Sequence, residues 1–216
     1  MKINELLVAL LLAMGAFGLS GCAPQEIKNI NSRGKAIVCF GDSLTYGYGV
    51  ERGEDYPGAL AKMVSQPVVN AGVNSNTTPE GLLRLNADVL AHDPKFVIIG
   101  FGCNDFLKQI PKEVTAENIR TMIDRIQEKN AMVALVDVSA GMLFSEYQPL
   151  LRGIAREKGA LFIPNVFYNV TTNPSLKSDF VHPNKQGYAI IAKRIFQAIK
   201  PFLEKNKLSR PAEKRP

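Results

Sequence analysis

The stretch FGDSLTYGYG, residues 40–49, places Ser43 at a sharp break after an apolar run. Two interpretations of this serine are open. Gly, Asp and Ser are common turn residues and Ser is a favoured N-cap, so Ser43 can simply begin a helix. It can also be a nucleophile held at the end of a strand, provided that the chain supplies a base, an orienting acid and an oxyanion donor elsewhere.

The chain contains two histidines, so few side chains can serve as the base. His182 follows Asp179 by three residues in the segment KSDFVHPNKQGY. On a loop, this spacing lets the carboxylate accept the imidazole Nδ1–H, which fixes the tautomer and leaves Nε2 free as a base. The alternative is that both are ordinary loop residues before a helix. His92 is explained more simply as a cationic side chain at the end of a helix.

Asn104 follows an apolar run in IIGFGCND, where its side-chain N–H can donate to a developing oxyanion. An Asn-Asp turn is the alternative interpretation of the same residues. The cysteines form neither a C-x-x-C motif nor a Cys/His cluster with zinc spacing. Acyl transfer by a serine needs no metal and no cofactor, and we expect neither.

Short apolar runs alternate along the chain with longer stretches of helical periodicity. The predicted strands are Ala36–Phe40, Pro67–Asn70, Phe96–Gly100, Met132–Val136 and Ala160–Ile163. The predicted helices are Tyr56–Val64, Pro79–Ala91, Ala116–Lys129, Phe144–Lys158 and one from Lys185 onward. Continuously apolar strands separated by helices indicate a parallel sheet covered on both faces. In such sheets ligands bind where the strands end, which would bring the segments around Ser43, Ala71 and Asn104 together.

Taken together, these segments resemble the SGNH (GDSL-type) hydrolase family over residues 36–203. Gly41-Asp42-Ser43-Leu44 matches the block that carries the nucleophile, Gly102-x-Asn104-Asp105 the block that carries an oxyanion donor, and Asp179-x-x-His182 the block that supplies the acid and the base. Segment 68–85, VVNAGVNSNTTPEGLLRL, is similar to the bacterial arylesterases and lysophospholipase-like acyl-thioesterases of that family. The resemblance implies a flavodoxin-like, three-layer α/β/α sandwich with a central five-stranded, mainly parallel sheet.

The resemblance also implies an oxyanion hole, made by the backbone N–H groups of Ser43 and Ser75 and the side chain of Asn104. At the position of Ser75 the family usually has glycine. A backbone N–H survives any side chain, but a Cβ can crowd the pocket or disfavour a positive φ.

The expected function is therefore that of a serine esterase that forms an acyl-enzyme on Ser43, with His182 as base and Asp179 as its orienting acid. Aryl esters, acyl esters, lysophospholipids and acyl thioesters are the expected substrate classes. An O-deacetylase of envelope polysaccharide is the alternative enzyme. A non-catalytic envelope-binding lipoprotein is the alternative of another class, and Ser75 is the feature that points to it.

The N-terminus has the pattern of an exported lipoprotein. The uncharged run of residues 6–19 is short for a membrane span, which needs about 20 residues, and suits a signal peptide. Leu19-Ser20-Gly21-Cys22 then resembles a bacterial lipobox, which predicts a lipid anchor on Cys22; an incidental Cys after a plain signal peptide is the alternative. We expect residues 1–21 to be the signal and the protein to lie at the periplasmic face of the cell envelope. Ala23, where Asp could follow the cysteine, favours the outer membrane by resemblance to sorting patterns in Gram-negative bacteria.

The rest of the chain suits one globular domain, because 46% of its residues are hydrophobic and 21% charged. Residues 22–35 are predicted to be a polar tether and residues 204–216 a flexible basic tail. The net charge is +6, but no basic stripe is interleaved with aromatic residues, so nucleic-acid binding is not expected. Cys39 and Cys103 are expected to be two buried thiols, although an exported protein also permits a disulfide.

Overall fold

The computed structural model describes residues 26–139 and 145–209, so the predicted signal peptide, Cys22 and the end of the tail lie outside the described residues. Within those ranges, five strands form one sheet of order β2-β1-β3-β4-β5 in which every neighbouring pair is parallel. The strands are β1 (Ala36–Gly41), β2 (Val68–Gly72), β3 (Pro94–Gly100), β4 (Met132–Val136) and β5 (Leu161–Ile163). The predicted α/β fold with a central parallel sheet is confirmed.

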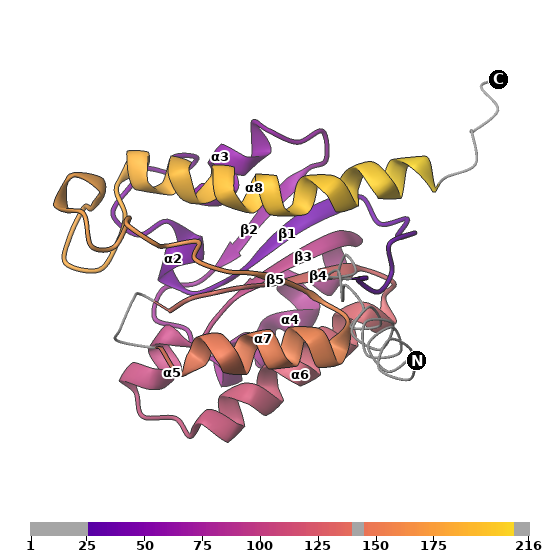
Figure 1. The fold of residues 1–216 in the computed structure, drawn as a ribbon, viewed down its shortest axis with the longest axis horizontal. Coiled ribbons are helices and arrows are strands. Elements are labelled where there is room, and N and C mark those ends of the chain that lie inside the picture. Colours follow the sequence, from indigo (N-terminus) through magenta and orange to yellow (C-terminus); the bar gives the residue numbers. More distant parts are fainter. Residues whose placement is uncertain (1–25, 140–144, 210–216) are drawn as a thin grey trace, which may run out of the picture.

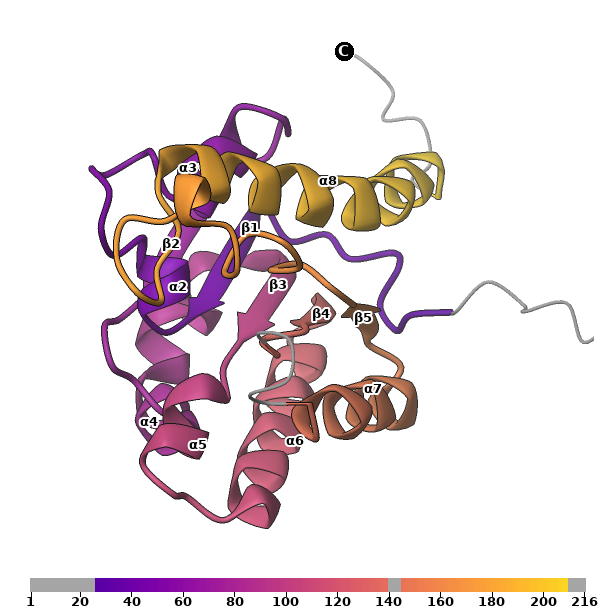
Figure 2. The ribbon, with the colours of Figure 1, turned by 60° about the vertical axis from the view of Figure 1, so that its left-hand side comes forward.

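Helices cover both faces of the sheet (Figures 1 and 2). Strands β1, β3 and β4 are buried along their whole length, which explains why they read as continuous apolar runs rather than alternating ones. One face is covered by α3 (Tyr56–Ala61) and α8 (Lys185–Leu208). The other is covered by α4 (Thr78–Asp88), α6 (Lys112–Glu128) and α7 (Tyr147–Lys158).

Short elements lie between these layers. Helix α2 (Ser43–Tyr46) follows β1 and α5 (Cys103–Leu107) follows β3, so both begin where a strand ends. The 3₁₀ turns are η1 (Leu90–His92) and η2 (Pro174–Leu176). None of the helices in the described part of the chain is long and apolar enough to cross a membrane.

Helix ends differ from their predicted positions where a cap decides them. Helix α6 begins four residues before the predicted Ala116, because Pro111 serves as its N-cap. The predicted helix 79–91 is divided: α4 ends at Asp88 and η1 follows it. Helix α3 ends at Ala61, three residues early. Phe144, the predicted start of another helix, lies outside the described residues.

The expected tether differs most from the structure, because residues 27–32 pack against the domain. Ile27 is buried, and the backbone N–H of Lys28 donates to the carbonyl of Gly159 at 2.8 Å. The side chain of Asn29 donates to the carbonyls of Gln127 and Ala131 at 2.9 and 3.0 Å. Ala131 directly precedes β4, Gly159 lies two residues before β5 and Gln127 lies in the last turn of α6, so the segment lies at the edge where the strands begin.

The expected tail also differs, because α8 continues to Leu208. In its last turn Asn206 is buried and donates to the carbonyls of Ile30 and Ser32 at 2.7 and 3.0 Å, while it accepts from Lys95 Nζ at 3.4 Å. We call residues 27–32, with the side chains of Asn29 and Asn206 that hold them, the N-terminal clamp. It ties the two ends of the domain together.

Candidate active site

Ser43 lies where β1 ends. Asp42, not Ser43, is the N-cap of α2, since its carboxylate accepts from the backbone N–H of Leu44 at 3.0 Å. The hydroxyl of Ser43 is therefore not used in capping. Gly41 must be glycine here, because a Cβ would lie 2.2 Å from Thr45 Oγ1 and 2.6 Å from the Gly100 carbonyl oxygen.

The structure brings Ser43, His182 and Asp179 together in one chain of hydrogen bonds. Ser43 Oγ lies 3.1 Å from His182 Nε2, and His182 Nδ1 lies 2.8 Å from Asp179 Oδ2. A carboxylate can only accept, so Nδ1 carries the proton and Nε2 is left to accept from the serine hydroxyl. Such an arrangement can activate a serine for nucleophilic attack.

The carboxylate of Asp179 has a second task. Its Oδ1 accepts from the backbone N–H groups of Val181 and His182, both at 2.7 Å. Partial burial opposes ionisation, but these two bonds and the imidazole lower the pKa of Asp179 to about 2. One oxygen thus fixes the turn of the loop while the other orients the imidazole, and the group stays ionised at any pH near neutrality.

The loop that carries His182 is supported from two sides. The ring of Tyr48, from the segment after α2, packs against the imidazole with centroids 4.5 Å apart. Gly49 has a φ of +87°, and a Cβ there would lie 2.1 Å from Ser178 Oγ, so a side chain at position 49 would displace the loop. On the other side, Asn184 caps α8 by accepting from Gly187 N–H and donates to the Ser175 carbonyl.

The predicted oxyanion residues lie in the segment after β2 and at the start of α5. Asn104 Nδ2 donates to the carbonyl of Asn76 at 3.0 Å and contacts Asp42 Oδ2 at 3.5 Å, so it links the Ser75 segment to the turn before Ser43. Ser75 has a φ of +60°, in the left-handed region that favours glycine. The chain thus keeps a backbone conformation suited to glycine with serine in place, at a cost of about 1 kcal/mol.

Arg84 is the residue at this site that the sequence reasoning missed. Its guanidinium donates to the carbonyls of Gly41 and Ala71, both at 2.8 Å, and to Asn76 Oδ1 at 2.7 Å. It also lies 4.6 Å above the ring of Phe40, and its side chain is only 15% exposed. Arg84 therefore joins the ends of β1 and β2 to the Ser75 segment. The sequence signal that could have indicated Arg84 is its position in segment 68–85, which resembles the family.

Asp105 and Lys108 also hold this edge. The buried carboxylate of Asp105 accepts from Thr78 N–H and Thr115 Oγ1, both at 3.0 Å, and from the Thr78 hydroxyl. This joins α5 to the start of α4 and to α6. Lys108 Nζ donates to the carbonyl of Ser75 at 3.0 Å.

The second histidine and the two described cysteines are not part of this site. His92 is exposed in η1, just before β3 begins and thus at the opposite edge from Ser43. Cys39 and Cys103 are free thiols, but only Cys39 in β1 is buried as expected; Cys103 is half-buried and donates to the Val138 carbonyl. Within residues 26–139 and 145–209, no group of three or more His, Cys, Asp or Glu side chains is placed to hold a metal ion.

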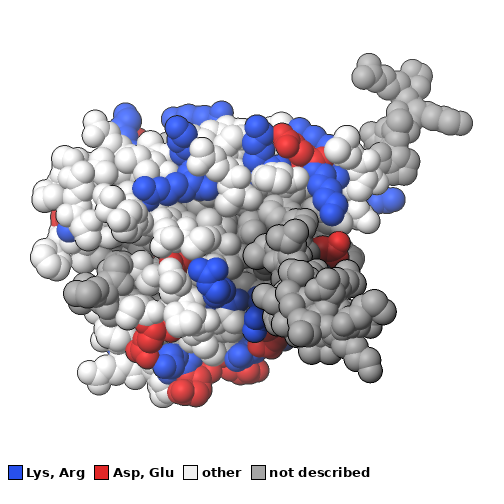
Figure 3. Space-filling model, viewed as in Figure 1, with Lys and Arg blue, Asp and Glu red and all other residues white. Residues whose placement is uncertain are grey.

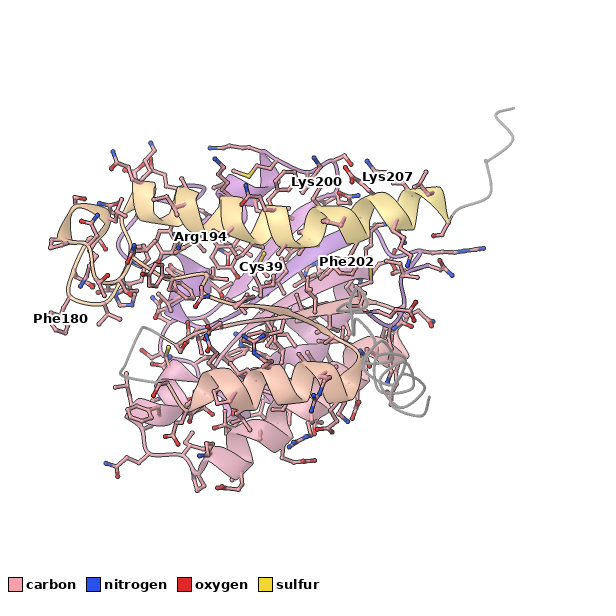
Figure 4. The ribbon with its side chains drawn as sticks, viewed as in Figure 1. Cys39, Phe180, Arg194, Lys200, Phe202 and Lys207 are labelled. Atoms are coloured by element: carbon pink, nitrogen blue, oxygen red, sulfur yellow. The ribbon has the colours of Figure 1, made fainter. Side chains whose placement is uncertain are left out.

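Apolar side chains border the catalytic loop. Phe180 is 89% exposed and Val181 51%, and both lie between Asp179 and His182 in the sequence. Figure 4 shows Phe180 projecting from the loop at one end of the molecule. We call Tyr48, Phe180 and Val181 the apolar rim. Exposed apolar groups beside a nucleophile suit an apolar part of a substrate.

Comparison with known proteins agrees with this geometry. Residues 39–190 match the model of the GDSL-like Lipase/Acylhydrolase family. The chain is 26% identical over 175 residues to thioesterase 1/protease 1/lysophospholipase L1 of Escherichia coli (strain K12), covering 77% of this chain and 84% of that protein. Uncharacterized lipoprotein YqeF of Bacillus subtilis (strain 168) is 38% identical over 77 residues, 32% of this chain and 31% of that protein. The crystal structure of the esterase EstA from Pseudoalteromonas sp., inhibited by monoethylphosphonate, matches with a TM-score of 0.70 and 25% identity over 79% of this chain and 99% of that one.

Substitutions at the oxyanion residues should separate a backbone donor from a side-chain donor. Ser75→Gly and Ser75→Ala should keep kcat within about tenfold of wild type, because the backbone N–H remains. Asn104→Ala should lower kcat by about 10²–10³ with a smaller change in KM, since the donor acts on charge that develops in the transition state. Steady-state kinetics on one activated ester checks both. Equal losses at the two positions would give the Ser75 hydroxyl a catalytic role.

Arg84→Lys should lower kcat by about 10- to 100-fold while the protein still folds. A lysine keeps the charge but cannot bond three acceptors in one plane, so the strand ends and the Ser75 segment lose their register. The control is Arg125→Lys on α6, whose guanidinium donates to the Asn86 side chain. Both variants are compared by circular dichroism and by kinetics. Wild-type turnover in Arg84→Lys would mean that Arg84 does not position the site.

Proposed function

The chain belongs to the GDSL-like lipase/acylhydrolase family, and on that basis we propose that it is a serine esterase that cleaves carboxylic esters through an acyl-enzyme on Ser43. As a member of that family it is a hydrolase. The observation that carries the proposal is the continuous chain of hydrogen bonds from Asp179 through His182 to Ser43. A cap or a turn residue would not need a base within 3.1 Å of its hydroxyl.

The proposed reaction begins when His182 Nε2 takes the proton of Ser43 as Oγ attacks the ester carbonyl. The backbone N–H groups of Ser43 and Ser75 hold the oxyanion. The Asn104 amide joins them by turning the N–H that makes the long 3.5 Å contact with Asp42 Oδ2 to the oxyanion, while its other N–H stays on the Asn76 carbonyl. The protonated imidazole, stabilised by Asp179, then gives its proton to the leaving alcohol as the C–O bond breaks. Water enters, loses a proton to His182 and cleaves the acyl-enzyme, which releases the acid and restores Ser43.

The proposed substrates have an apolar acyl or aryl group, in keeping with the apolar rim. Acyl esters and aryl esters fit this description, and the name of the Escherichia coli relative adds thioesters and lysophospholipids. The O-deacetylase alternative requires only an acetyl group beside Ser43. Ser75 was the feature that pointed to a non-catalytic protein, but its φ of +60° lies in the left-handed region that glycine would adopt there, which supports the enzyme instead.

The proposed location is the cell envelope, with a lipid on Cys22 and the domain on the periplasmic side of an outer membrane. The lipobox-like residues 19–22 support the anchor. The partial similarity to a protein named as a lipoprotein agrees with it.

Ser43→Ala should abolish hydrolysis and covalent labelling by a fluorophosphonate, while the fold is kept. We expect wild type to cleave several p-nitrophenyl esters in a panel from acetyl to palmitoyl. Hydrolysis of acetyl esters alone would favour the O-deacetylase.

His182→Ala should be inactive, whereas the matched variant His92→Ala should keep turnover. If His92→Ala were inactive with a normal melting profile, the assignment of the base would be wrong.

The acid limb of kcat/KM should follow one proton, because His182 must be neutral to accept from Ser43. Asp179, with a pKa of about 2, remains ionised and does not contribute to that limb. Burial raises the pKa of Asp42 to about 7, although the hydrogen bond from Leu44 N–H lowers it. Asp42 is therefore the other group that could produce the acid limb, and it has to be excluded. The limb should persist in Asp42→Asn, which retains a capping oxygen. Its loss in that variant would assign the limb to Asp42.

Cys22→Ser should release the protein from the membrane fraction into the soluble exported fraction, because the thioether to the lipid can no longer form. Fractionation followed by immunoblotting measures this. Wild-type protein found free of the membrane would contradict lipidation.

A further inference from the structure

We propose that this enzyme acts on esters outside the leaflet that anchors it, because the fold holds the anchor and the active site at opposite ends. The inference rests on the proposed esterase activity and on the proposed lipid at Cys22. It narrows the substrate class to esters that reach the site through water, either dissolved or carried on a polymer. Lipids of the anchoring leaflet are then poor substrates.

The anchor end is defined by the N-terminal clamp. Ile27 is 7% exposed and Ser32 2%, so this part of the chain is built into the domain rather than suspended from it. The clamp is bonded to the Gly159, Gln127 and Ala131 carbonyls, near the start of β4 and β5, and Lys95 near the start of β3 supports Asn206. The chain from Cys22 therefore joins the domain at the edge where the strands begin.

The catalytic end is the edge where the strands end. The length of α8 gives the distance between this edge and the N-terminal clamp. His182 lies three residues before α8 begins, and Asn206 lies in its last turn. A helix rises 1.5 Å per residue, so the 21 residue steps from Lys185 to Asn206 span about 32 Å. Figure 4 shows the same separation, with Phe180 at one end of the long axis and Lys207 at the other.

The number of residues between Cys22 and Ile27 limits how far the lipid can lie from the clamp. Five residue steps separate Cys22 from the buried Ile27, and a fully extended chain covers at most about 3.6 Å per step, or about 18 Å in all. This is little more than half of the distance along α8. The proposed lipid on Cys22 is therefore held within about 18 Å of Ile27 at the clamp end of the domain.

The surface charge gives the main alternative orientation. Lys and Arg side chains gather over α8 (Figure 3), and Lys193, Lys200 and Lys207 are exposed at seven-residue spacing on one side of the helix. This basic side could lay the domain flat on anionic headgroups. In that orientation both ends of α8, and with them the catalytic end, would lie beside the anchoring leaflet, which is the opposite of the proposal and makes it testable.

The first test measures height above the bilayer. The full chain, made with its signal in a bacterial host and with the lipid on Cys22 verified by mass, is reconstituted into vesicles of phosphatidylcholine or of phosphatidylcholine with phosphatidylglycerol. A fluorescent phosphonate marks Ser43, and the same fluorophore on Lys207→Cys marks the clamp end. Energy transfer to a lipid-borne acceptor should be at least threefold stronger from position 207. Equal transfer, or stronger transfer from Ser43, in either vesicle overturns the proposal.

The second test measures access. The vesicles carry the longest 4-methylumbelliferyl ester that the protein cleaves in detergent micelles, and 4-methylumbelliferyl butyrate is supplied in solution. A variant with twenty Gly and Ser residues inserted between Glu26 and Ile27 is the comparison. The insertion should raise hydrolysis of the vesicle ester at least tenfold and leave the soluble ester within twofold. Equal rates on the vesicle ester would overturn the proposal.

The two experiments distinguish failure of the esterase, of the anchor and of the orientation. No label on Ser43 and no hydrolysis of the soluble ester would overturn the proposed esterase, and this inference with it. An unmodified Cys22 would overturn the anchor and this inference, but not the esterase. A labelled, anchored and active protein with its site at the bilayer would overturn this inference alone.

Discussion

Burial of both faces of a parallel sheet is the constraint on which the rest of this structure depends. Strands β1, β3 and β4 are covered completely, so the connections between strands must be helices that return the chain to the same edge. Every strand therefore ends at one edge, where β1 delivers Ser43 and β3 delivers Asn104. The polar groups that a reaction needs are placed there by the packing of apolar ones elsewhere.

Precision at that edge comes from charged side chains bonded to backbone groups. Arg84 joins the carbonyl ends of two strands, Asp105 holds the start of α4, and Asp179 holds the turn that presents His182. Each fixes an irregular segment by charge-assisted hydrogen bonds, with Asp105 buried, Arg84 half-buried and Asp179 exposed. Such bonds set the relative positions of the three candidate catalytic side chains without touching a substrate.

The sequence predicted those parts that have local signals. Apolar runs predicted the strands, and the types and order of Ser43, Asn104, Asp179 and His182 predicted which loops would meet. Arg84 was missed because an arginine four residues before an aspartate resembles a solvated helical ion pair, and Asp88 does accept from it. Its other acceptors, on Gly41, Ala71 and Asn76, come from outside the helix. The clamp was missed for the same reason: the segment 23–35 is polar, and its partners are carbonyl groups and an asparagine far along the chain.

The clamp also has a consequence for how the protein is made. Asn206 bonds Ile30 across 176 positions, so the contact cannot form until nearly the whole chain has been synthesised and exported. If Cys22 is acylated while the polypeptide is still emerging, the enzyme is attached to its membrane first and oriented afterwards. Folding during export would then end when α8 packs against the N-terminal clamp. Only this last step would fix the orientation of the active site relative to the membrane.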